Sequence, residues 1–150
     1  MIPTSSMSNS ALLSQYPQKE KRLLYWYHLL RRLQQKIPKA LRRSHDLARD
    51  LQRLNHPVRI HKGQLCFTFP LNTVDIGLEL DLYASDAGVF RQVFLEREYH
   101  ALVERCEKLQ LRPGRMVDAG ANIGLASLYL KAYFPALEVL ALEPNPRNLQ

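Results

Sequence analysis

Two short apolar segments, each with an acidic residue at or just beyond its end, constrain the fold of this 150-residue chain more than any other feature. The first, 115–119, contains Asp118 and runs into a glycine turn and a helical segment. The second, 137–142, is followed by Glu143, 25 positions after Asp118. Strand, turn, helix and strand with short connections predict a βαβ unit with parallel strands and a right-handed crossover. We therefore expect an α/β fold with both acids at one edge of its sheet.

Hydrophobic periodicity predicts the other elements. Apolar residues at helical spacing predict helices over 18–37, 38–55, 87–109 and 123–134. Alternation predicts strands over 58–61, 65–69 and 76–83, and apolar runs predict buried strands over 115–119 and 137–142. In the helix over 87–109, the side chains expected to face inward are Phe90, Val93, Phe94, Tyr99, Leu102 and Cys106. Ser85 or Asp86 is expected to cap this helix through its side-chain oxygen.

Positive charge is concentrated near the N-terminus, although the whole chain carries +7. Residues 1–60 hold 12 lysines and arginines against three acidic residues, whereas residues 61–150 hold nine against 11. The first expected helix places lysines and arginines opposite an apolar stripe that includes Trp26 and Tyr27. The predicted regions are a disordered N-terminus (1–17), a basic amphipathic helical extension (18–56) and an α/β part that opens with a short β-hairpin and strand (57–150).

Composition and motifs exclude several classes of protein. With 46% hydrophobic and 23% charged residues, the chain has the composition of a folded globular protein. No apolar run approaches the roughly 20 residues that span a bilayer, and the Ser-rich start lacks the apolar core of a signal peptide. Cys66 and Cys106 form no CxxC motif and have no histidine at metal spacing. We expect reduced thiols in a cytoplasmic protein and no metal site.

The residues around the glycine turn predict a nucleoside-binding site, because ligands bind beyond the carboxyl ends of parallel strands. Gly120 permits a sharp turn, and Gly124 permits close packing at a helix start whose N–H groups favour an anion. Glu143 can accept hydrogen bonds from ribose hydroxyls. The turn reads Gly-Ala-Asn-Ile-Gly, with Asn122 where a dinucleotide motif favours glycine. Asp118 would repel a pyrophosphate but suits the amino group of S-adenosylmethionine.

A wider set of residues resembles the FkbM family of S-adenosylmethionine-dependent methyltransferases. The matching segments are Ser85-Asp86 with Val89-Phe90-Arg91-Gln92-Val93-Phe94 and Glu98-Tyr99, then Val117-Asp118-Ala119-Gly120-Ala121-Asn122-Ile123-Gly124, and Glu143-Pro144-Asn145-Pro146. The resemblance covers roughly residues 76–150. It implies a class I methyltransferase fold with a Rossmann-like sheet, and O-methylation of a small molecule or sugar. Ala119 departs from the family pattern, in which a branched aliphatic residue is common there.

The resemblance also implies roles for individual residues. The methionine end of S-adenosylmethionine would be held by Asp118, Gly120, Ala121, Asn122 and Gly124. Glu143 would hold the ribose, and Pro144 and Asn145 would border the adenine. Glu98 and Tyr99 could close over the methionine end. The catalytic base and the acceptor pocket are expected beyond Gln150, because no residue up to that point suits the role of base.

Residues 57–150 would then be the N-terminal part of such a domain, ending after its second core strand. We expect the chain alone to be poorly folded or aggregation-prone and inactive, as a fragment of a longer product or a degenerate remnant. The alternative is a non-catalytic interaction module in which residues 18–56 contact a membrane surface or nucleic acid. Nucleic acid is the less expected partner, since no nucleic-acid motif is present. A solvated helical extension, and nucleotide-sugar or NAD chemistry on the same βαβ unit, also remain open.

Overall fold

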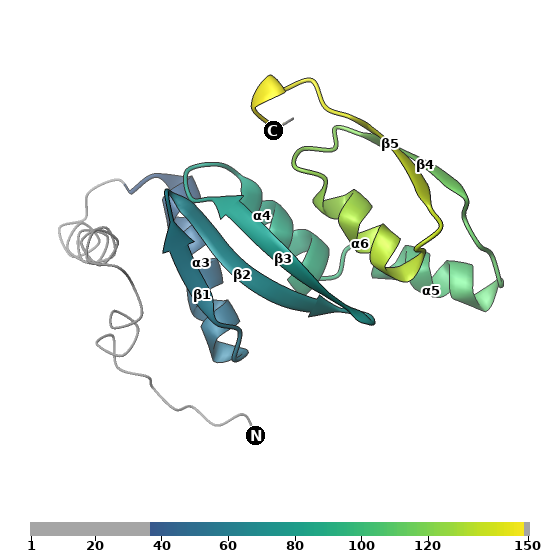
Figure 1. Cartoon of the computed structure of the whole chain (residues 1–150), viewed down its shortest axis with the longest axis horizontal. Helices are drawn as coiled ribbons and strands as arrows, with labels where there is room; N and C mark the ends of the chain where they lie inside the picture. Colours follow the sequence, from purple (N-terminus) through teal and green to yellow (C-terminus); the bar gives the residue numbers. More distant parts are fainter. Residues whose placement is uncertain (1–36, 149–150) are drawn as a thin grey trace.

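The computed structural model describes residues 37–148. Its first elements are helix α3 (Lys39–Arg53) and strands β1 (Val58–His61), β2 (Gln64–Leu71) and β3 (Val74–Asp81). The strands form one antiparallel sheet in the order β1-β2-β3, and α3 lies beside it (Figure 1). The predicted helix over 38–55 and the three predicted strands are confirmed within a few residues at their ends. The predicted disordered segment 1–17 and the predicted helix 18–37, apart from its last residue, lie outside the described residues.

Alternating side chains place one face of this sheet in the core. On β1, Val58 and Ile60 are buried, whereas the residues that follow each of them are exposed. Val58 pairs with Phe67 of β2, which is also buried, so neighbouring strands bury the same face. Helix α3 covers this face with Leu47 and Leu51, neither of which is accessible to solvent. Each such leucine contributes about 1.5–3 kcal/mol to stability through burial.

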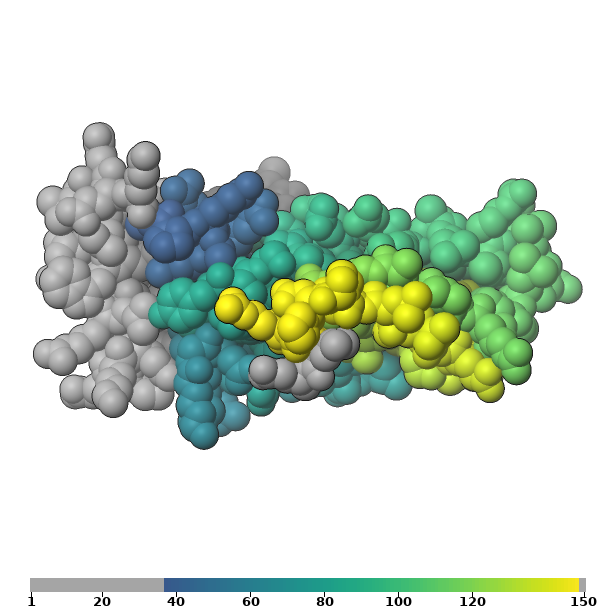
Figure 2. Space-filling model, turned by 90° about the horizontal axis from the view of Figure 1, so that it is seen from above, coloured from purple at the N-terminus to yellow at the C-terminus, as the bar shows by residue number. Residues whose placement is uncertain are grey.

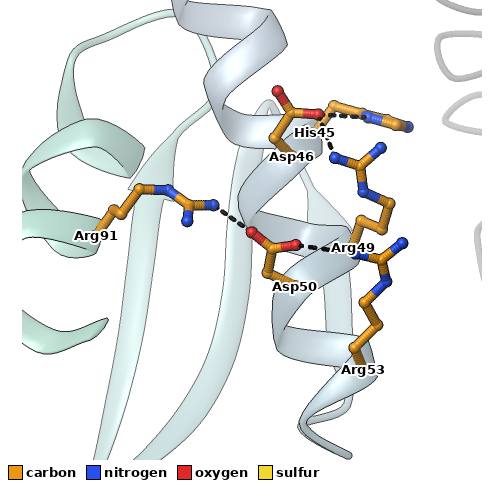
Figure 3. A network of polar contacts seen from close by, with 6 residues as sticks. All are labelled: His45, Asp46, Arg49, Asp50, Arg53 and Arg91. Carbon is orange, nitrogen blue, oxygen red and sulfur yellow. Dashed lines mark hydrogen bonds and ion pairs between the residues drawn. The ribbon is translucent and has the colours of Figure 1, made fainter. Parts of the chain in front are cut away.

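Ion pairs add to the packing of α3 against the next helical segment (Figure 3). Asp50 accepts a hydrogen bond from Arg91, and its Oδ1 lies 3.7 Å from Nη1 of Arg53. One turn earlier, Asp46 accepts a hydrogen bond of 2.9 Å from Arg49. The side chains of Asp50 and Arg91 are 27% and 36% exposed, so water screens this pair in part. The apolar face of α3 therefore contributes more to its position than these charges do.

The prediction of a single helix over 87–109 is wrong. The structure has three pieces there: α4 (Asp86–Phe90), η1 (Arg91–Leu95), which is π-helical, and α5 (His100–Lys108). At the break before α5, Arg97 has a φ of +56°, and the Glu98 N–H donates to the Gln92 carbonyl at 3.1 Å. No glycine or proline marks the break. Helical periodicity runs through the whole stretch and cannot reveal it, because the packing of each piece against its neighbours decides where the helix ends.

The break also changes which side chains face the core. Phe90, Val93, Phe94 and Cys106 are buried as predicted, and Tyr99 is half-buried. Leu102 is 50% exposed instead of inward, because α5 has a different rotation from the one that a continuous helix would give it. The inward direction therefore depends on the break and not on spacing alone.

The predicted side-chain cap of α4 is wrong as well. Ser85 is the N-cap residue but makes no side-chain capping bond; its backbone carbonyl accepts the N–H groups of Gly88 and Val89. The buried carboxylate of Asp86 accepts the Asp81 N–H at 3.0 Å. Asp86 therefore ties the start of α4 to the end of β3.

The C-terminal part is a βαβ unit, as predicted. Strands β4 (Arg115–Ala119) and β5 (Glu138–Leu142) pair in parallel, and helix α6 (Leu125–Tyr133) connects them. On the inner face of this pair, Met116 and Val139 pack against the core. Two small sheets, one antiparallel and one parallel, thus combine with helices into a mixed α/β fold (Figure 1).

The outer face of the parallel pair is exposed, so the prediction of two buried strands is wrong for this face. Val117, Leu140 and Leu142 are 61%, 59% and 49% exposed, and Val117 pairs with Leu140. Figure 2 shows the segment around β5 and the residues after it at the surface of one side of the molecule. Within residues 37–148, a helix covers only the inner face of the pair.

One continuous core joins the two sheets. Phe90 and Phe94 stack with ring centroids 4.7 Å apart, and Phe67 and Phe69 meet Phe90 edge-on. Phe94 in turn meets Tyr129 of α6 at 5.6 Å. Aromatic pairs in these arrangements stabilise a core beyond their area burial. No helix among residues 37–148 has the length and hydropathy that a bilayer crossing requires.

Candidate functional site

The turn after β4 contains three residues in the left-handed backbone region. The φ angle is +84° at Gly120, +53° at Asn122 and +78° at Gly124. Glycine adopts this conformation without steric cost, and asparagine tolerates it better than most residues. A Cβ atom at Gly120 or Gly124 would meet no atom within 4 Å, so backbone conformation and not close packing requires these glycines. The turn also delays α6, which starts at Leu125 and not at Ile123 as predicted.

Backbone hydrogen bonds join this turn to the end of β5. The N–H groups of Gly120 and Ala121 donate to the Leu142 carbonyl at 2.7 and 3.1 Å. The next N–H, of Asn122, donates to Glu143 Oε2 at 2.7 Å. Three consecutive N–H groups thus hold the turn beside the strand end that carries Glu143.

Asp118, at the end of β4, points toward α6. Its Oδ2 accepts a hydrogen bond of 2.5 Å from the hydroxyl of Ser127, which is 9% exposed. A carboxylate offers about four lone-pair positions. The second oxygen, Oδ1, accepts no hydrogen bond from residues 37–148. Asp118 is half-buried, so its charge is available to a ligand beside the turn.

The carboxylate of Glu143 is already oriented by the chain. Its Oε2 accepts the Asn122 N–H and its Oε1 accepts the Asn145 N–H at 2.8 Å. Each oxygen can accept a second hydrogen bond, because a carboxylate oxygen has two lone pairs. Pro144 and Asn145 are exposed beside it. Glu143 can thus still accept hydrogen bonds from a ribose, the role predicted for it, while its side chain also supports the turn.

Glu98 and Tyr99 lie in the break between η1 and α5. Glu98 is exposed, and Tyr99 is half-buried against the core. Within residues 37–148, no hydrogen bond or ion pair joins either side chain to the turn at 120–124 or to Glu143. A direct role of these two residues at a ligand stays a prediction.

Contacts of Arg97 and His100 hold the break against α6. Arg97 touches His100 Nε2, and His100 Nδ1 lies 3.2 Å from the hydroxyl of the buried Tyr129. Burial raises the pKa of Tyr129, against the smaller opposing effect of Arg97. The hydroxyl of Tyr129 in turn raises the pKa of Arg97. These contacts fix the break relative to the helix that begins at the glycine turn.

Ser127 and Asn148 belong to this region, although the sequence did not indicate either. Ser127 is a polar residue within the apolar run Leu-Ala-Ser-Leu-Tyr-Leu, a pattern that could have suggested a hydrogen-bond partner on the adjacent strand. Asn148 donates from Nδ2 to Asn122 Oδ1 at 2.9 Å. No local pattern predicts that contact, because its two residues are 26 positions apart.

The hydrogen-bond acceptors and donors gathered here can bind a ligand with several polar groups. They are two carboxylates, Asp118 and Glu143, and the N–H groups of the first turn of α6, which have no acceptor within the helix. Such a set suits a ligand with a cationic group, an anionic group and neighbouring hydroxyls. Among residues 37–148, no group of three or more histidine, cysteine or acidic residues could hold a metal ion.

The chain is similar to two fungal methyltransferases over short stretches. It is 33% identical over 70 residues to "Methyltransferase 1" of Beauveria bassiana (strain ARSEF 2860), which is 45% of this chain and 27% of that protein. It is 61% identical over 31 residues to "Methyltransferase sdnD" of Sordaria araneosa, which is 21% of this chain and 12% of that protein. The chain thus spans less than a third of either relative.

No family model matches the chain, and no solved structure does. The FkbM resemblance is therefore not confirmed. Both partial matches are to proteins whose names describe them as methyltransferases.

Proposed function

We propose that residues 57–150 form the cofactor-binding part of an FkbM-like, S-adenosylmethionine-dependent methyltransferase with a Rossmann-like sheet. The acceptor is a hydroxyl group of a small molecule or sugar. One observation carries this proposal: two strand-end carboxylates, Asp118 and Glu143, lie on either side of a left-handed glycine turn at the start of α6. The two fungal methyltransferases support the same reaction class.

The methionine end of the cofactor would lie at the turn. Oδ1 of Asp118 is available to the ammonium group, since Ser127 occupies only Oδ2. The first N–H groups of α6 suit the carboxylate, because they lack intrahelical acceptors and lie at the positive end of the helix dipole. The N–H groups of Gly120 and Ala121 donate to β5 and that of Asn122 donates to Glu143, so these residues shape this end and contribute no N–H to the ligand.

The adenosine end would lie beside Glu143. The remaining lone pairs of its two oxygens match the two hydroxyls of a ribose. Pro144 and Asn145 follow at the exposed strand end, where they can border the adenine. Glu98 and Tyr99 would approach from the break before α5, which the contact of His100 with Tyr129 holds against α6.

Bound S-adenosylmethionine supplies an activated methyl group on a sulfonium centre. The residues of this chain bind and orient the cofactor so that an acceptor oxygen can approach in line, and such positioning accounts for much of the rate enhancement. A hydroxyl acceptor also needs a group that removes its proton. None of the residues at the turn or at the end of β5 is assigned to that step.

The proposal is tested by calorimetric titration of S-adenosylhomocysteine and 5′-methylthioadenosine, which lacks the amino-acid end. The variant Asp118→Asn removes the charge but keeps an oxygen that can accept the Ser127 hydrogen bond. Losing one charge-assisted hydrogen bond weakens binding about 10- to 100-fold. We expect this loss for S-adenosylhomocysteine and no change for 5′-methylthioadenosine.

Equal effects of Asp118→Asn on both ligands would contradict the assignment of Asp118 to the ammonium group. Absence of binding to the folded wild-type chain by either ligand would contradict the proposed function itself. Circular dichroism of the same samples separates a loss of binding from a loss of fold.

Peripheral membrane contact through residues 18–56 remains a second proposal. The described part of that segment gives it little support, because the acidic residues of α3 pair with nearby arginines, Asp46 with Arg49 and Asp50 with Arg53 and Arg91 (Figure 3). Binding to vesicles with and without an anionic lipid tests it; equal binding to both would argue against it.

A further inference from the structure

Four residues around the proposed ribose site form a closed ring of hydrogen bonds. Glu143 accepts the N–H of Asn122 on Oε2 and the N–H of Asn145 on Oε1, at 2.7 and 2.8 Å. The Nδ2 group of Asn148 donates to Asn122 Oδ1 at 2.9 Å, and Nδ2 of Asn145 lies 3.5 Å from Asn148 Oδ1. The ring thus joins the glycine turn to the segment that follows β5.

The backbone of this segment is arranged to bring Asn148 back to the turn. Residues Pro146–Asn148 form a short 3-10 helix, η2. Its start is held by Asn145, whose carbonyl accepts the Asn148 N–H at 3.0 Å and whose Oδ1 accepts the Arg147 N–H at 3.2 Å. The chain therefore curls back toward the loop before α6 (Figure 1).

Asn122 occupies a position at which glycine would be free of strain. Its φ of +53° lies in the left-handed region, which is unfavourable for residues with a Cβ atom. Glycine would keep the backbone and the N–H bond to Glu143 but would remove the amide that binds Asn148. The side chain of Asn122 thus closes the ring at a conformational cost.

We propose that Asn122 and Asn148 are positioning residues, which hold the Glu143 carboxylate and the segment after β5 in the geometry that binds the ribose of the cofactor. The inference rests on the proposed function and goes beyond it, since it assigns the preorganisation of the ribose site to two side chains that the ligand need not touch. Preorganisation strengthens binding because less ordering remains to be done when the ligand arrives.

The test uses the full chain with Asn122→Gly, Asn148→Ala and the double variant, titrated with S-adenosylhomocysteine, adenosine and 2′-deoxyadenosine. One neutral hydrogen bond corresponds to an affinity change of about two- to tenfold. We expect a loss of this size for the first two ligands and a smaller one for 2′-deoxyadenosine, which lacks one ribose hydroxyl. Because either change opens the same ring, the double variant should lose no more than a single variant.

Asn55→Gly is the matched control. Asn55 also has a positive φ, +62°, but it is an exposed residue after α3 and outside the ring. We expect it to leave all three affinities unchanged, and circular dichroism checks that every variant is folded.

Three outcomes would overturn the inference. Losses that multiply in the double variant would indicate independent contacts, and unchanged affinities in both single variants would show that the ring does not act on the ligand. In either case binding of S-adenosylhomocysteine to the wild type would still support the proposed function. If the wild type binds neither S-adenosylhomocysteine nor adenosine, both the inference and the proposed function fail.

Discussion

Replacing Gly124 by alanine isolates the conformational cost of the turn at the candidate site. Gly124 has a φ of +78°, and a Cβ atom there would meet nothing within 4 Å. The substitution therefore adds backbone strain without a steric clash. Left-handed geometry costs a residue with a Cβ atom about 1–2 kcal/mol relative to the right-handed region.

Gly114 provides the matched control. A Cβ atom at Gly114 also meets nothing within 4 Å, and its φ lies outside the left-handed region. Both substitutions reduce the entropy of the unfolded chain equally, which at an unstrained position stabilises by about 0.4–1 kcal/mol. We expect Gly114→Ala to stabilise the chain slightly and Gly124→Ala to have a free energy of unfolding lower than that of Gly114→Ala by about 1–2 kcal/mol.

Urea denaturation at low protein concentration measures this difference, provided that the dependence on urea is the same for both variants. Gly124→Asn should lose less stability than Gly124→Ala, because asparagine tolerates the left-handed region and is a favourable N-cap residue. Equal free energies of unfolding for Gly114→Ala and Gly124→Ala would refute the left-handed turn, and with it the geometry on which the candidate site depends.

Two further predictions concern the exposed sheet face and a buried acid. Because Leu140 is 59% exposed beside Val117, we expect the chain to self-associate as its concentration rises. Leu140→Lys should reduce this self-association, as measured by sedimentation velocity. The control variant Leu109→Lys, at an exposed position off the sheet, should leave it unchanged. Burial raises the pKa of Asp86 above its ordinary value of 3.8, against the opposing effect of the hydrogen bond from the Asp81 N–H, and the charge of Asp81 adds a smaller increase. The folded state therefore favours the protonated acid and loses stability as the pH rises through that pKa. Asp86→Asn should therefore gain stability over the wild type between pH 3 and pH 7 in thermal unfolding, and a constant difference would contradict this reasoning.

The expectation that the chain is inactive and either poorly folded or aggregation-prone stays a prediction. The core of the chain is continuous from α3 to α6, whereas Val117, Leu140 and Leu142 are exposed. Of the two expected outcomes, the structure therefore favours aggregation of a folded chain over poor folding. A cooperative unfolding transition from a monomer at all concentrations would contradict the expectation.

Sequence periodicity located most elements but not the break before α5. The strands and α3 have alternating or helical patterns that span a whole element, and the structure has them at nearly the predicted positions. The stretch from Arg91 to Tyr99 consists of residues that are compatible with a continuous helix. Its π-helical segment and the positive φ of Arg97 arise where the chain must turn to place α5, and no residue type there announces this change.

The sequence predicted the strand-end acids and the glycine turn of the candidate site. It did not predict the hydrogen-bond partners of the two acids. Asp118 and Glu143 could be found because parallel strands bring their carboxyl ends to one edge. The structure adds that Ser127 donates a hydrogen bond to Asp118 and that two backbone N–H groups each donate to one carboxylate oxygen of Glu143. These contacts join residues distant in sequence, so spacing alone could not predict them.

The sequence by itself determined the local conformations: glycines where φ must be positive, an acid at the end of each parallel strand, and apolar residues at the period of each helix or strand. Only the tertiary structure decided which face of β4 and β5 is covered, where the helix after β3 breaks, and which side chains complete the ring at Glu143. The physical reason is the distance along the chain over which each interaction acts. Backbone preferences depend on a residue and its neighbours, whereas burial and side-chain hydrogen bonds depend on segments that only the folded chain brings together.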